Sequence, residues 1–299
     1  MSLPSNEIVD YAFARVLFPG LAKPRDPQSH KGTHGTLAII GGAAGMSGAI
    51  VLAGRAAIKQ GAGKVHLGFL QAQLPIAYDF EQPELMLAKA DDLLQRTDID
   101  AWVIGCGLGQ SQDAHECVQR CLNLKTDTPL LLDADGLNLL AKSQALQAGL
   151  TQSTSPKILT PHEAEAARIL NIDIADVKQY RQAAAKELAT TFAAWVVLKG
   201  AASIICSPQG EFSINPSGNA ALATAGSGDV LSGLCGSLLA QGLEIDQAVR
   251  GAVWIHGAAA DLAVHASSKK HRIGPIGFTA HEIIDFARHI RNQVAYGHE

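Results

Sequence analysis

Three small residues followed by an aspartate form the strongest candidate for a reactive site in this sequence. Gly226, Ser227 and Gly228 lead directly into Asp229, and an apolar helical pattern begins after them. Glycines allow a tight turn in which several backbone N–H groups converge at the positive end of the following helix. Such a turn predicts a site for an anion, most simply a phosphate group.

The carboxylate of Asp229 suggests a chemical role for this anion site. A negative side chain beside a bound anion is electrostatically costly unless it serves a reaction. It could accept the proton of a hydroxyl group that attacks a phosphoryl group, while the amides of the turn stabilise the developing charge. The alternative is an ordinary turn in which Asp229 caps the helix. The many small residues before and after the turn favour the close approach of a ligand.

Two further glycine-rich turns follow predicted strands. In GGAAGMSGA, the residues Ser47 to Ala49 start a helix, which either faces a ligand or only needs glycine for tight packing of the strand and helix. The turn GCGLGQ at 105–110 has more glycines than a turn needs, and this favours a ligand beside the backbone. Neither the first turn nor GAGKV at 61–65 fits a common nucleotide-binding fingerprint.

Two aspartates in LDADGLN stand at the end of another predicted strand. For Asp133 we favour a local role in a satisfied turn, with Asp135 capping the next helix. Alternatively, one of the two carboxylates holds a magnesium ion through water. We favour this functional interpretation for Asp135 rather than for Asp133.

The segment LTPHEAEA places a histidine where a strand ends and a helix begins. His162 follows Pro161, and Glu163 and Glu165 lie in the first helical turn, where the helix dipole favours carboxylates. An isolated histidine at a helix start is commonly a cap or a surface residue. Its position at the carboxyl end of a strand favours a role in function, because ligands of parallel sheets bind there.

These turns are joined by alternating strand and helix patterns, which predict a mostly parallel sheet covered by helices on both faces. Strands are expected within 36–42, 64–70, 101–109, 129–136, 156–159, 194–200, 202–207 and 211–215, the last two as a hairpin around Pro208 and Gly210. Helices are expected at 47–60, at 174–191, at 229–241, at 246 to about 266, and at 279 to about 293, the last opened by a Thr279–Glu282 capping box.

No linker or change of composition divides the chain, so we predict one domain over residues 1–299. Its first 35 residues are expected to form a short helix, from about Ser5 to Leu17, and a proline-rich arm over the domain surface.

Composition excludes several classes of function. The net charge is -4 and only 5% of residues are aromatic, which leaves little for binding nucleic acid. The five cysteines form no CxxC pair, and this is typical of reduced thiols in a cytosolic protein. The sequence shows no signal peptide, and no apolar run approaches the roughly 18 residues of a membrane span. We therefore expect a cytoplasmic protein without membrane or nucleic-acid partners.

The motifs together resemble a known superfamily. TPHEAEA, VLKGAAS and NAALATAGSGDVLSG, in this order and spacing, resemble the ribokinase-like superfamily, in which a Gly-x-Gly-Asp loop forms an anion hole and its aspartate is the base. HKGTHGTLAIIGG, GCGLG, LDADGLN and LTPH resemble one branch, the ADP-dependent NAD(P)H-hydrate dehydratases that repair hydrated nicotinamide cofactors. The resemblance covers Pro24 to the last helix, and it implies a three-layer α/β/α sandwich.

The resemblance implies a specific reaction. ADP phosphorylates the C6 hydroxyl of (6S)-hydrated NADH or NADPH (NADHX, NADPHX), and elimination then returns NADH or NADPH with AMP and phosphate. Asp229 would accept the hydroxyl proton, while the amides of Gly226, Ser227 and Gly228 would stabilise the transferring phosphoryl group.

Individual residues take roles by the same resemblance. The contacts to the hydrated cofactor fall on Ser47, Gly107, Gly109, His162 and Asp229. The contacts to ADP or AMP fall on Lys199, Gly200, Ala201, Ala202, Ser203 and Gly228. From the sequence alone, without the resemblance, we would interpret Lys199 only as a charged residue at the end of a strand. Kinases of the superfamily have TPNxxE; here His162 replaces the Asn, and Glu165 keeps the position near magnesium, so it is the candidate metal residue.

The resemblance also implies partners. ADP is the co-substrate and Mg²⁺ the cofactor, the assembly is a homotetramer, and a separate NAD(P)H-hydrate epimerase is expected because no epimerase domain fits before Thr36. Two other functions stay open. An ATP-dependent vitamin or sugar kinase would keep Asp229 and the anion turn. A non-catalytic nucleotide sensor would do better with a neutral residue at Asp229.

Overall fold

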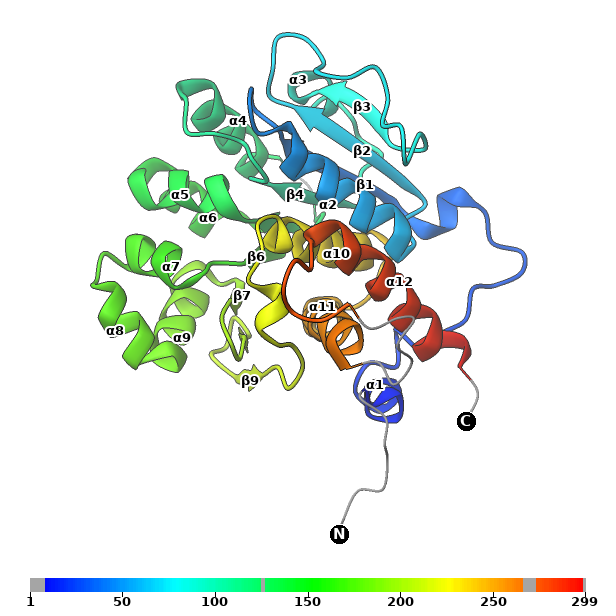
Figure 1. Cartoon of the computed structure of the whole chain (residues 1–299). Helices are drawn as coiled ribbons and strands as arrows, with labels where there is room; N and C mark the ends of the chain where they lie inside the picture. Colours follow the sequence, from blue (N-terminus) through cyan, green and yellow to red (C-terminus); the bar gives the residue numbers. More distant parts are fainter. Residues whose placement is uncertain (1–8, 125–126, 266–272, 298–299) are drawn as a thin grey trace.

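The computed structural model describes residues 9–124, 127–265 and 273–297. Within these ranges, nine strands form one sheet in the order β3-β2-β1-β4-β5-β6-β7-β8-β9 (Figure 1). Strands β1 to β7 are parallel, and β8 runs antiparallel between β7 and β9. The strands are β1 (Thr36–Gly41), β2 (Lys64–Phe69), β3 (Met86–Lys89), β4 (Ala101–Ile104), β5 (Leu130–Leu132), β6 (Lys157–Leu159), β7 (Trp195–Leu198), β8 (Ile204–Cys206) and β9 (Phe212–Ile214).

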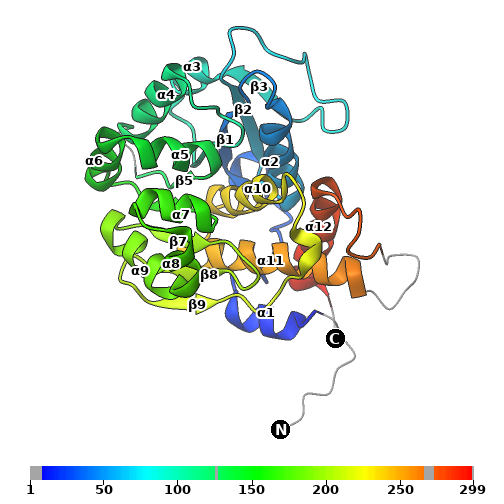
Figure 2. The ribbon, with the colours of Figure 1, turned by 60° about the vertical axis from the view of Figure 1, so that its left-hand side comes forward.

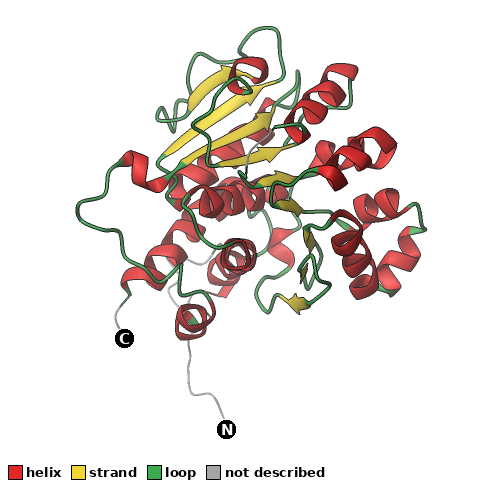
Figure 3. Ribbon diagram, turned by 180° about the vertical axis from the view of Figure 1, so that it is seen from behind, coloured by secondary structure: helices red, strands yellow, loops and turns green. Residues whose placement is uncertain are grey.

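Helices cover both faces of this sheet (Figure 3). They are α1 (Tyr11–Leu17), α2 (Ser47–Gln60), α3 (Ala90–Leu93), α4 (Gln112–Leu122), α5 (Ala134–Lys142), α6 (Gln144–Gln152), α7 (Glu163–Leu170), α8 (Ile174–Gln179), α9 (Arg181–Phe192), α10 (Ser227–Ala240), α11 (Ile245–His265) and α12 (Ala280–Tyr296). Short 3₁₀ helices lie at η1 (Lys31–His34) and η2 (Ala220–Leu222). No helix in the described ranges has the length and apolar character needed to cross a membrane.

Strand β1 shows how the two cores arise. Its side chains alternate between the faces of the sheet, so Leu37 and Ile39 pack in one core with α2, α10, α11 and α12. Ala38 and Ile40 pack in the second core with α4, α5, α6, α7 and α9. All four side chains are fully buried, as expected for a parallel sheet with both faces covered. The three-layer α/β/α sandwich with a mostly parallel sheet is confirmed.

Several local predictions are confirmed with their physical reasons. Helix α2 ends at Gly61 in the left-handed region (φ 112°), which glycine adopts at little cost. Helix α12 begins at the Thr279–Glu282 capping box, where the Glu282 carboxylate accepts the Thr279 N–H at 2.8 Å. Strands β8 and β9 form the hairpin expected around Pro208 and Gly210.

Other local predictions differ from the structure. Edge strand β3 was not predicted, because Met86–Lys89 has no alternating pattern and pairs only with β2. The helical stretch 174–191 is two helices, divided at Tyr180, whose backbone (φ -123°, ψ 47°) is not helical. Helix α1 begins at Tyr11, since Asp10 caps it by accepting the Phe13 N–H. Residues 5–8 and 266, which were predicted to be helical, lie outside the described residues.

Candidate active site

A cavity of about 750 Å³ lies at the carboxyl ends of β5, β6 and β7 and at the start of α10. Most of the residues predicted from the sequence to meet ligands line it, namely His162, Glu165, Lys199, Gly200, Ala201, Ser203, Ser227, Gly228 and Asp229. These residues come from three segments far apart in the sequence, which meet here as expected for ligands of parallel sheets. Ala202 is not among the lining residues.

Helix α10 starts where the anion turn was predicted, and it packs against α2 and α11 (Figure 2). Gly226 is its N-cap residue, with a φ of 85°, so Asp229 lies in the first turn and does not cap the helix. A side chain at Gly226 would come within 2.6 Å of Leu52 Cδ1, and one at Gly228 within 3.4 Å of Lys199 Nζ. Glycine is needed at Gly226 for both its backbone and its packing.

Asp229 is a half-buried carboxylate at the cavity wall. Burial and the negative charge of Asp133 together raise its pKa to about 6, against the opposing effects of the hydrogen bond with the Cys106 thiol and the charge of Lys199. The group is therefore mostly ionised at neutral pH, yet more basic than an ordinary aspartate. This is the property that a general base needs.

A buried ionic cluster lies beside the anion turn in the same cavity. Lys199 Nζ lies 2.7 Å from Asp133 Oδ1 and 3.9 Å from Glu165 Oε2. Burial disfavours the charge of Lys199, but the carboxylates of Asp133 and Glu165 outweigh it and raise the lysine pKa. Burial also raises the pKa of Glu165 to about 7, and Lys199 opposes that rise. The cluster thus holds a cation beside the anion turn.

The local role predicted for Asp133 was wrong. Asp133 is the N-cap residue of α5, but its side chain makes no capping hydrogen bond. Instead its carboxylate accepts from Lys199 Nζ and, at 2.7 Å, from the Ser232 hydroxyl of α10. Asp135, for which magnesium binding was favoured over capping, lies in the first turn of α5 and accepts the Gly109 N–H at 2.9 Å. The roles of Asp133 and Asp135 therefore depend on hydrogen-bond partners that are distant in the sequence.

His162 caps helix α7 and also lines the cavity. Its Nδ1 accepts the N–H groups of Ala164 and Glu165 at 3.1 and 3.2 Å, while Glu165 Oε2 accepts the His162 N–H at 2.7 Å. Because Nδ1 is an acceptor, Nε2 carries the proton of the neutral ring. Burial and the charge of Lys199 lower the pKa of His162 and so favour the neutral form. The Nε2–H group of this neutral ring lies at the cavity, 3.4 Å from Glu165 Oε1.

The remaining predicted contacts lie outside this cavity, at the ends of β1 and β4. The Ser47 hydroxyl accepts from Gln71 Nε2 at 2.9 Å. Gly107, with a φ of 60°, packs so closely that a side chain would lie 2.6 Å from the Met46 carbonyl oxygen. Cys106, the neighbour of Gly107, contacts the Asp229 carboxylate. The glycine-rich turn at 105–110 therefore lies next to the cavity, on the other side of Asp229.

Sequence reasoning missed His256 and the residues Asn215, Ser217 and Gly218, which also line the cavity. His256 lies on α11, with Nε2 3.1 Å from the Ser227 hydroxyl oxygen. Asp261 of the same helix accepts the Gly218 N–H at 2.7 Å and an amide N–H of Asn219 at 2.9 Å. The available signal was a pair of polar residues inside the otherwise small and apolar run AVWIHGAAAD.

Comparison with known proteins identifies the family. A family model described as NAD(P)H-hydrate dehydratase matches residues 37–283. The chain is 48% identical over 277 residues to the ADP-dependent (S)-NAD(P)H-hydrate dehydratase of Neisseria meningitidis serogroup B, and the match covers 93% of this chain and 92% of that relative. This chain belongs to the NAD(P)H-hydrate dehydratase family.

Other members of the NAD(P)H-hydrate dehydratase family agree with this assignment. The crystal structure of the ADP/ATP-dependent enzyme of Bacillus subtilis, co-crystallised with ATP/Mg²⁺, matches with a TM-score of 0.79 at 30% identity over 95% of this chain and 97% of that one. The bifunctional NAD(P)H-hydrate repair enzyme of Escherichia coli is 38% identical over 90% of this chain, which spans 50% of that relative. A ribokinase-like superfamily protein of Enterococcus faecalis, 21% identical with a TM-score of 0.75 and 99% of both chains covered, shares the fold.

Proposed function

We propose that this chain catalyses the ADP-dependent dehydration of (6S)-hydrated NADH or NADPH, releasing NADH or NADPH, AMP and phosphate. The observation that carries the proposal is the position of Asp229, whose carboxylate, with a pKa of about 6, lies in the first turn of α10 directly after the glycine turn. Membership of the NAD(P)H-hydrate dehydratase family supports the choice of substrate and donor.

The reaction proceeds in two steps. Asp229 accepts the proton of the C6 hydroxyl as its oxygen attacks the β-phosphorus of ADP, and the bond to the bridging oxygen breaks to release AMP. The amides of Gly226, Ser227 and Gly228 stabilise the transferring phosphoryl group, with Lys199 adding positive charge. Phosphate then leaves C6 as the ring nitrogen donates its electron pair and a proton leaves the neighbouring carbon, which restores the dihydronicotinamide.

The two substrates approach Asp229 from different sides. ADP occupies the cavity of about 750 Å³, where Lys199, Gly200, Ala201, Ser203 and Gly228 of the predicted nucleotide site line the wall and Ala202 does not. The hydrated cofactor lies towards Ser47, Gly107 and Gly109 and reaches His162 at the wall of the cavity. His162 supplies a neutral N–H donor, and the bare backbone of the two glycines allows close contact.

The donor groups at the cavity fit a magnesium ion that arrives with the nucleotide. Among the described residues, no group of three or more His, Cys, Asp and Glu side chains is arranged to bind a metal ion. A site formed by protein ligands alone is therefore not present in these residues. Asp133 and Glu165 do present carboxylate oxygens to the cavity, and Mg²⁺ is usually held by one or two carboxylates together with substrate phosphates. When bound, the ion supplies positive charge to the phosphate oxygens.

Three wider expectations belong to the same proposal. A separate NAD(P)H-hydrate epimerase supplies the reactive epimer, the protein is a homotetramer, and it works in the cytoplasm. The bifunctional character of the Escherichia coli relative supports a linked second activity. The five cysteines are free and buried, which fits a reducing compartment. Light scattering of the purified protein tests the tetramer.

The direct test follows the recovery of the reduced nicotinamide. Purified protein and Mg²⁺ are incubated with acid-hydrated NADH and either ADP or ATP, while absorbance, AMP and phosphate are measured. Recovery of absorbance with ADP, matched by AMP, is expected. Asp229→Asn should abolish most of it, and Asp285→Asn, a change at an exposed residue of α12, should not. No recovery with either nucleotide, with the active epimer confirmed present, contradicts the proposal. ADP formation from ATP with a small alcohol would indicate the kinase instead.

A further inference from the structure

A buried histidine outside the predicted set contacts the anion turn from the neighbouring helix. His256 is 7% exposed and lines the cavity from α11. Its Nε2 lies 3.1 Å from the Ser227 hydroxyl oxygen and 3.0 Å from the Ser227 carbonyl oxygen. One nitrogen thus faces two oxygens of the residue that opens helix α10.

The carbonyl oxygen decides where the proton of this imidazole lies. A carbonyl can only accept, so an Nε2 lone pair at this distance would be repelled, whereas an Nε2–H group forms a hydrogen bond. Burial lowers the pKa of His256 and the charge of Lys199 adds to the effect, while the hydrogen bond to the Ser227 carbonyl opposes it; the resulting pKa of about 4 makes the ring neutral at physiological pH. His256 is therefore a neutral donor at Nε2.

This donor fixes what the Ser227 hydroxyl can do. Because Nε2 already carries a hydrogen, Ser227 Oγ can only accept from it, and the serine hydrogen must point elsewhere. In the part of the chain that the structure describes, the Ser227 side chain forms no other hydrogen bond. Ser227 lines the cavity beside Gly228 and Asp229, so its hydrogen is available to a ligand there.

We propose that His256 is a positioning residue that turns the Ser227 hydroxyl into a donor to the transferring phosphoryl group. The Nε2–H group bonds the Ser227 carbonyl, which holds the ring in place, and bonds the hydroxyl oxygen, which directs the hydrogen into the cavity. The reverse tautomer would draw the serine hydrogen away and present lone pairs to an anion. The inference rests on the proposed function, since the phosphoryl group is that of ADP.

A pair of matched substitutions tests this role. His256→Gln keeps an N–H donor near the position of Nε2, and His256→Met has a similar size without a donor. We expect His256→Met to lower kcat about tenfold with little change in KM for the hydrated cofactor, because the lost interaction is made in the transition state. His256→Gln should recover most of kcat. His265→Gln, an exposed change on the same helix, is the control.

A double-mutant cycle separates positioning from a structural role. If His256 acts through the Ser227 hydroxyl, Ser227→Ala should lower kcat to a similar extent, and adding His256→Met to it should cost little more. Equal losses in His256→Gln and His256→Met, or fully additive losses in the double variant, would overturn the proposal. Melting temperatures are measured for each variant, so that kcat is compared only among folded proteins.

The tautomer can be read on the unaltered protein by long-range ¹H–¹⁵N NMR of its histidines. The His256 ring is assigned by its disappearance in His256→Gln or, if that variant does not fold, by its shift in Ser227→Ala. A neutral Nε2–H ring at pH 7 is expected, and an Nδ1–H ring would overturn the proposal. This readout is independent of turnover, so a failure of the dehydratase assay would count against the proposed function alone.

Discussion

Two buried carboxylates, Asp79 and Asp133, show the difference between a structural ion pair and a reactive one. Asp79 accepts from Arg55 at Nε and at Nη2, the latter at 2.7 Å, and from the N–H groups of Glu81 and Gln82 at 3.1 and 2.7 Å. These four N–H groups donate to Asp79, while a separate N–H group of Arg55, at Nη1, pairs with the exposed Glu81. Asp79 therefore holds the loop before β3 against α2.

Asp133 has a different arrangement. It shares the single cation of Lys199 with Glu165, and its charge also acts on Asp229. Three carboxylates beside one lysine leave residual negative charge at the cavity. Burial, together with the charge of Asp133, raises the pKa values of Glu165 and Asp229 to about 7 and about 6. A site that retains unsatisfied charge can bind and transfer protons, whereas a saturated ion pair only stabilises.

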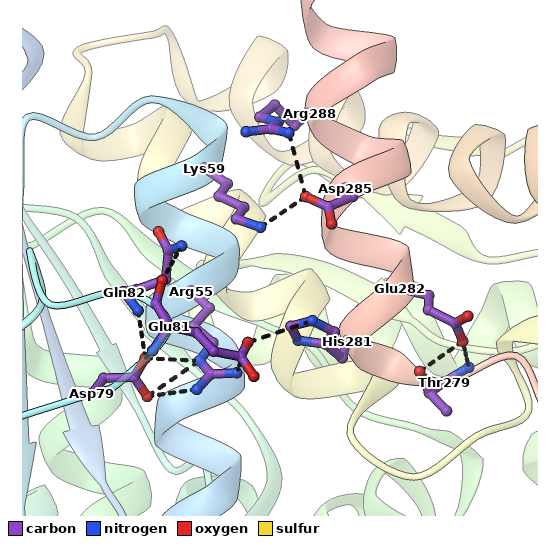
Figure 4. A network of polar contacts seen from close by, with 10 residues as sticks. All are labelled: Arg55, Lys59, Asp79, Glu81, Gln82, Thr279, His281, Glu282, Asp285 and Arg288. Atoms are coloured by element: carbon purple, nitrogen blue, oxygen red, sulfur yellow. Dashed lines mark hydrogen bonds and ion pairs between the residues drawn. The ribbon is translucent and has the colours of Figure 1, made fainter.

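The network around Asp79 extends over the outer surface between α2 and α12 (Figure 4). Arg55 also pairs with Glu81, which lies 3.6 Å from His281, and Lys59 pairs with Asp285 at 2.7 Å. Glu81 and Asp285 are more than half exposed, so water screens these outer pairs. We therefore expect the buried Arg55–Asp79 pair to contribute most to stability and the exposed pairs of Glu81 and Asp285 to contribute less.

The largest expected effect is that of Asp229→Asn on turnover. Removing the base should lower kcat by roughly 10²- to 10⁴-fold while ADP still binds. Steady-state kinetics and calorimetric titration with ADP measure the two quantities. Unchanged kcat would remove Asp229 from the mechanism and with it the contrast between the two carboxylates.

The same substitution should stabilise the protein. Folding raises the pKa of Asp229 from 3.8 to about 6, so ionisation destabilises the native state progressively between these values and fully above them. Asp229→Asn should therefore raise the free energy of unfolding by up to about 3 kcal/mol at pH 8 and leave it nearly unchanged at pH 4. Urea unfolding at both pH values is the measurement; a gain at pH 4 equal to that at pH 8 would contradict the electrostatic cause.

Asp79→Asn should produce the opposite pattern. Breaking a buried ion pair should lower the free energy of unfolding by about 3 kcal/mol, because the Arg55 guanidinium loses its bidentate partner. The kcat of the folded variant should stay within about twofold of the parent, since Asp79 does not line the cavity. Urea unfolding and kinetics on the same preparation decide the point. A large loss of kcat without loss of stability would be incompatible with a purely structural Asp79.

The pH profile provides a subtler test of the shared charge. Asp229 must be ionised to accept a proton, so kcat/KM should fall below an apparent pKa of about 6. Asp133→Asn should move this acid limb to lower pH, because it removes a negative neighbour and leaves Lys199 to favour the ionised base. Asp79→Asn is the matched control and should not shift it. A shift of the acid limb to higher pH in Asp133→Asn would contradict the predicted effect of the Asp133 charge on the pKa of Asp229.

The smallest effect is expected at the outer edge of the network. Lys59→Gln removes a surface pair with Asp285, and such pairs contribute at most about 1 kcal/mol. The melting temperature should change by only a few degrees at low salt, and less at high salt, because salt screens the pair. If Lys59→Gln lowered the stability as much as Asp79→Asn, the contribution of an ion pair would not depend on its burial.

The sequence contained enough to predict the sheet, most of its helices and the anion turn, because these depend on short-range patterns. Apolar runs predicted the strands, Gly61 ended a helix, and Gly226 predicted the turn before α10, although the helix already begins at Ser227 rather than at Asp229. Edge strand β3 could not be predicted from the sequence, because its strand conformation depends on pairing with β2 rather than on its own residues.

Only the tertiary structure decided which charges share the site. Asp133 read locally as a turn residue, and its actual partners, Lys199 and Ser232, lie 66 and 99 residues away. His256 carried no recognisable motif, since its role arises from the packing of α11 against α10. Local sequence determines backbone conformation over a few residues, but the pKa of a buried group depends on its neighbours in space, and these are brought together only by the completed sheet.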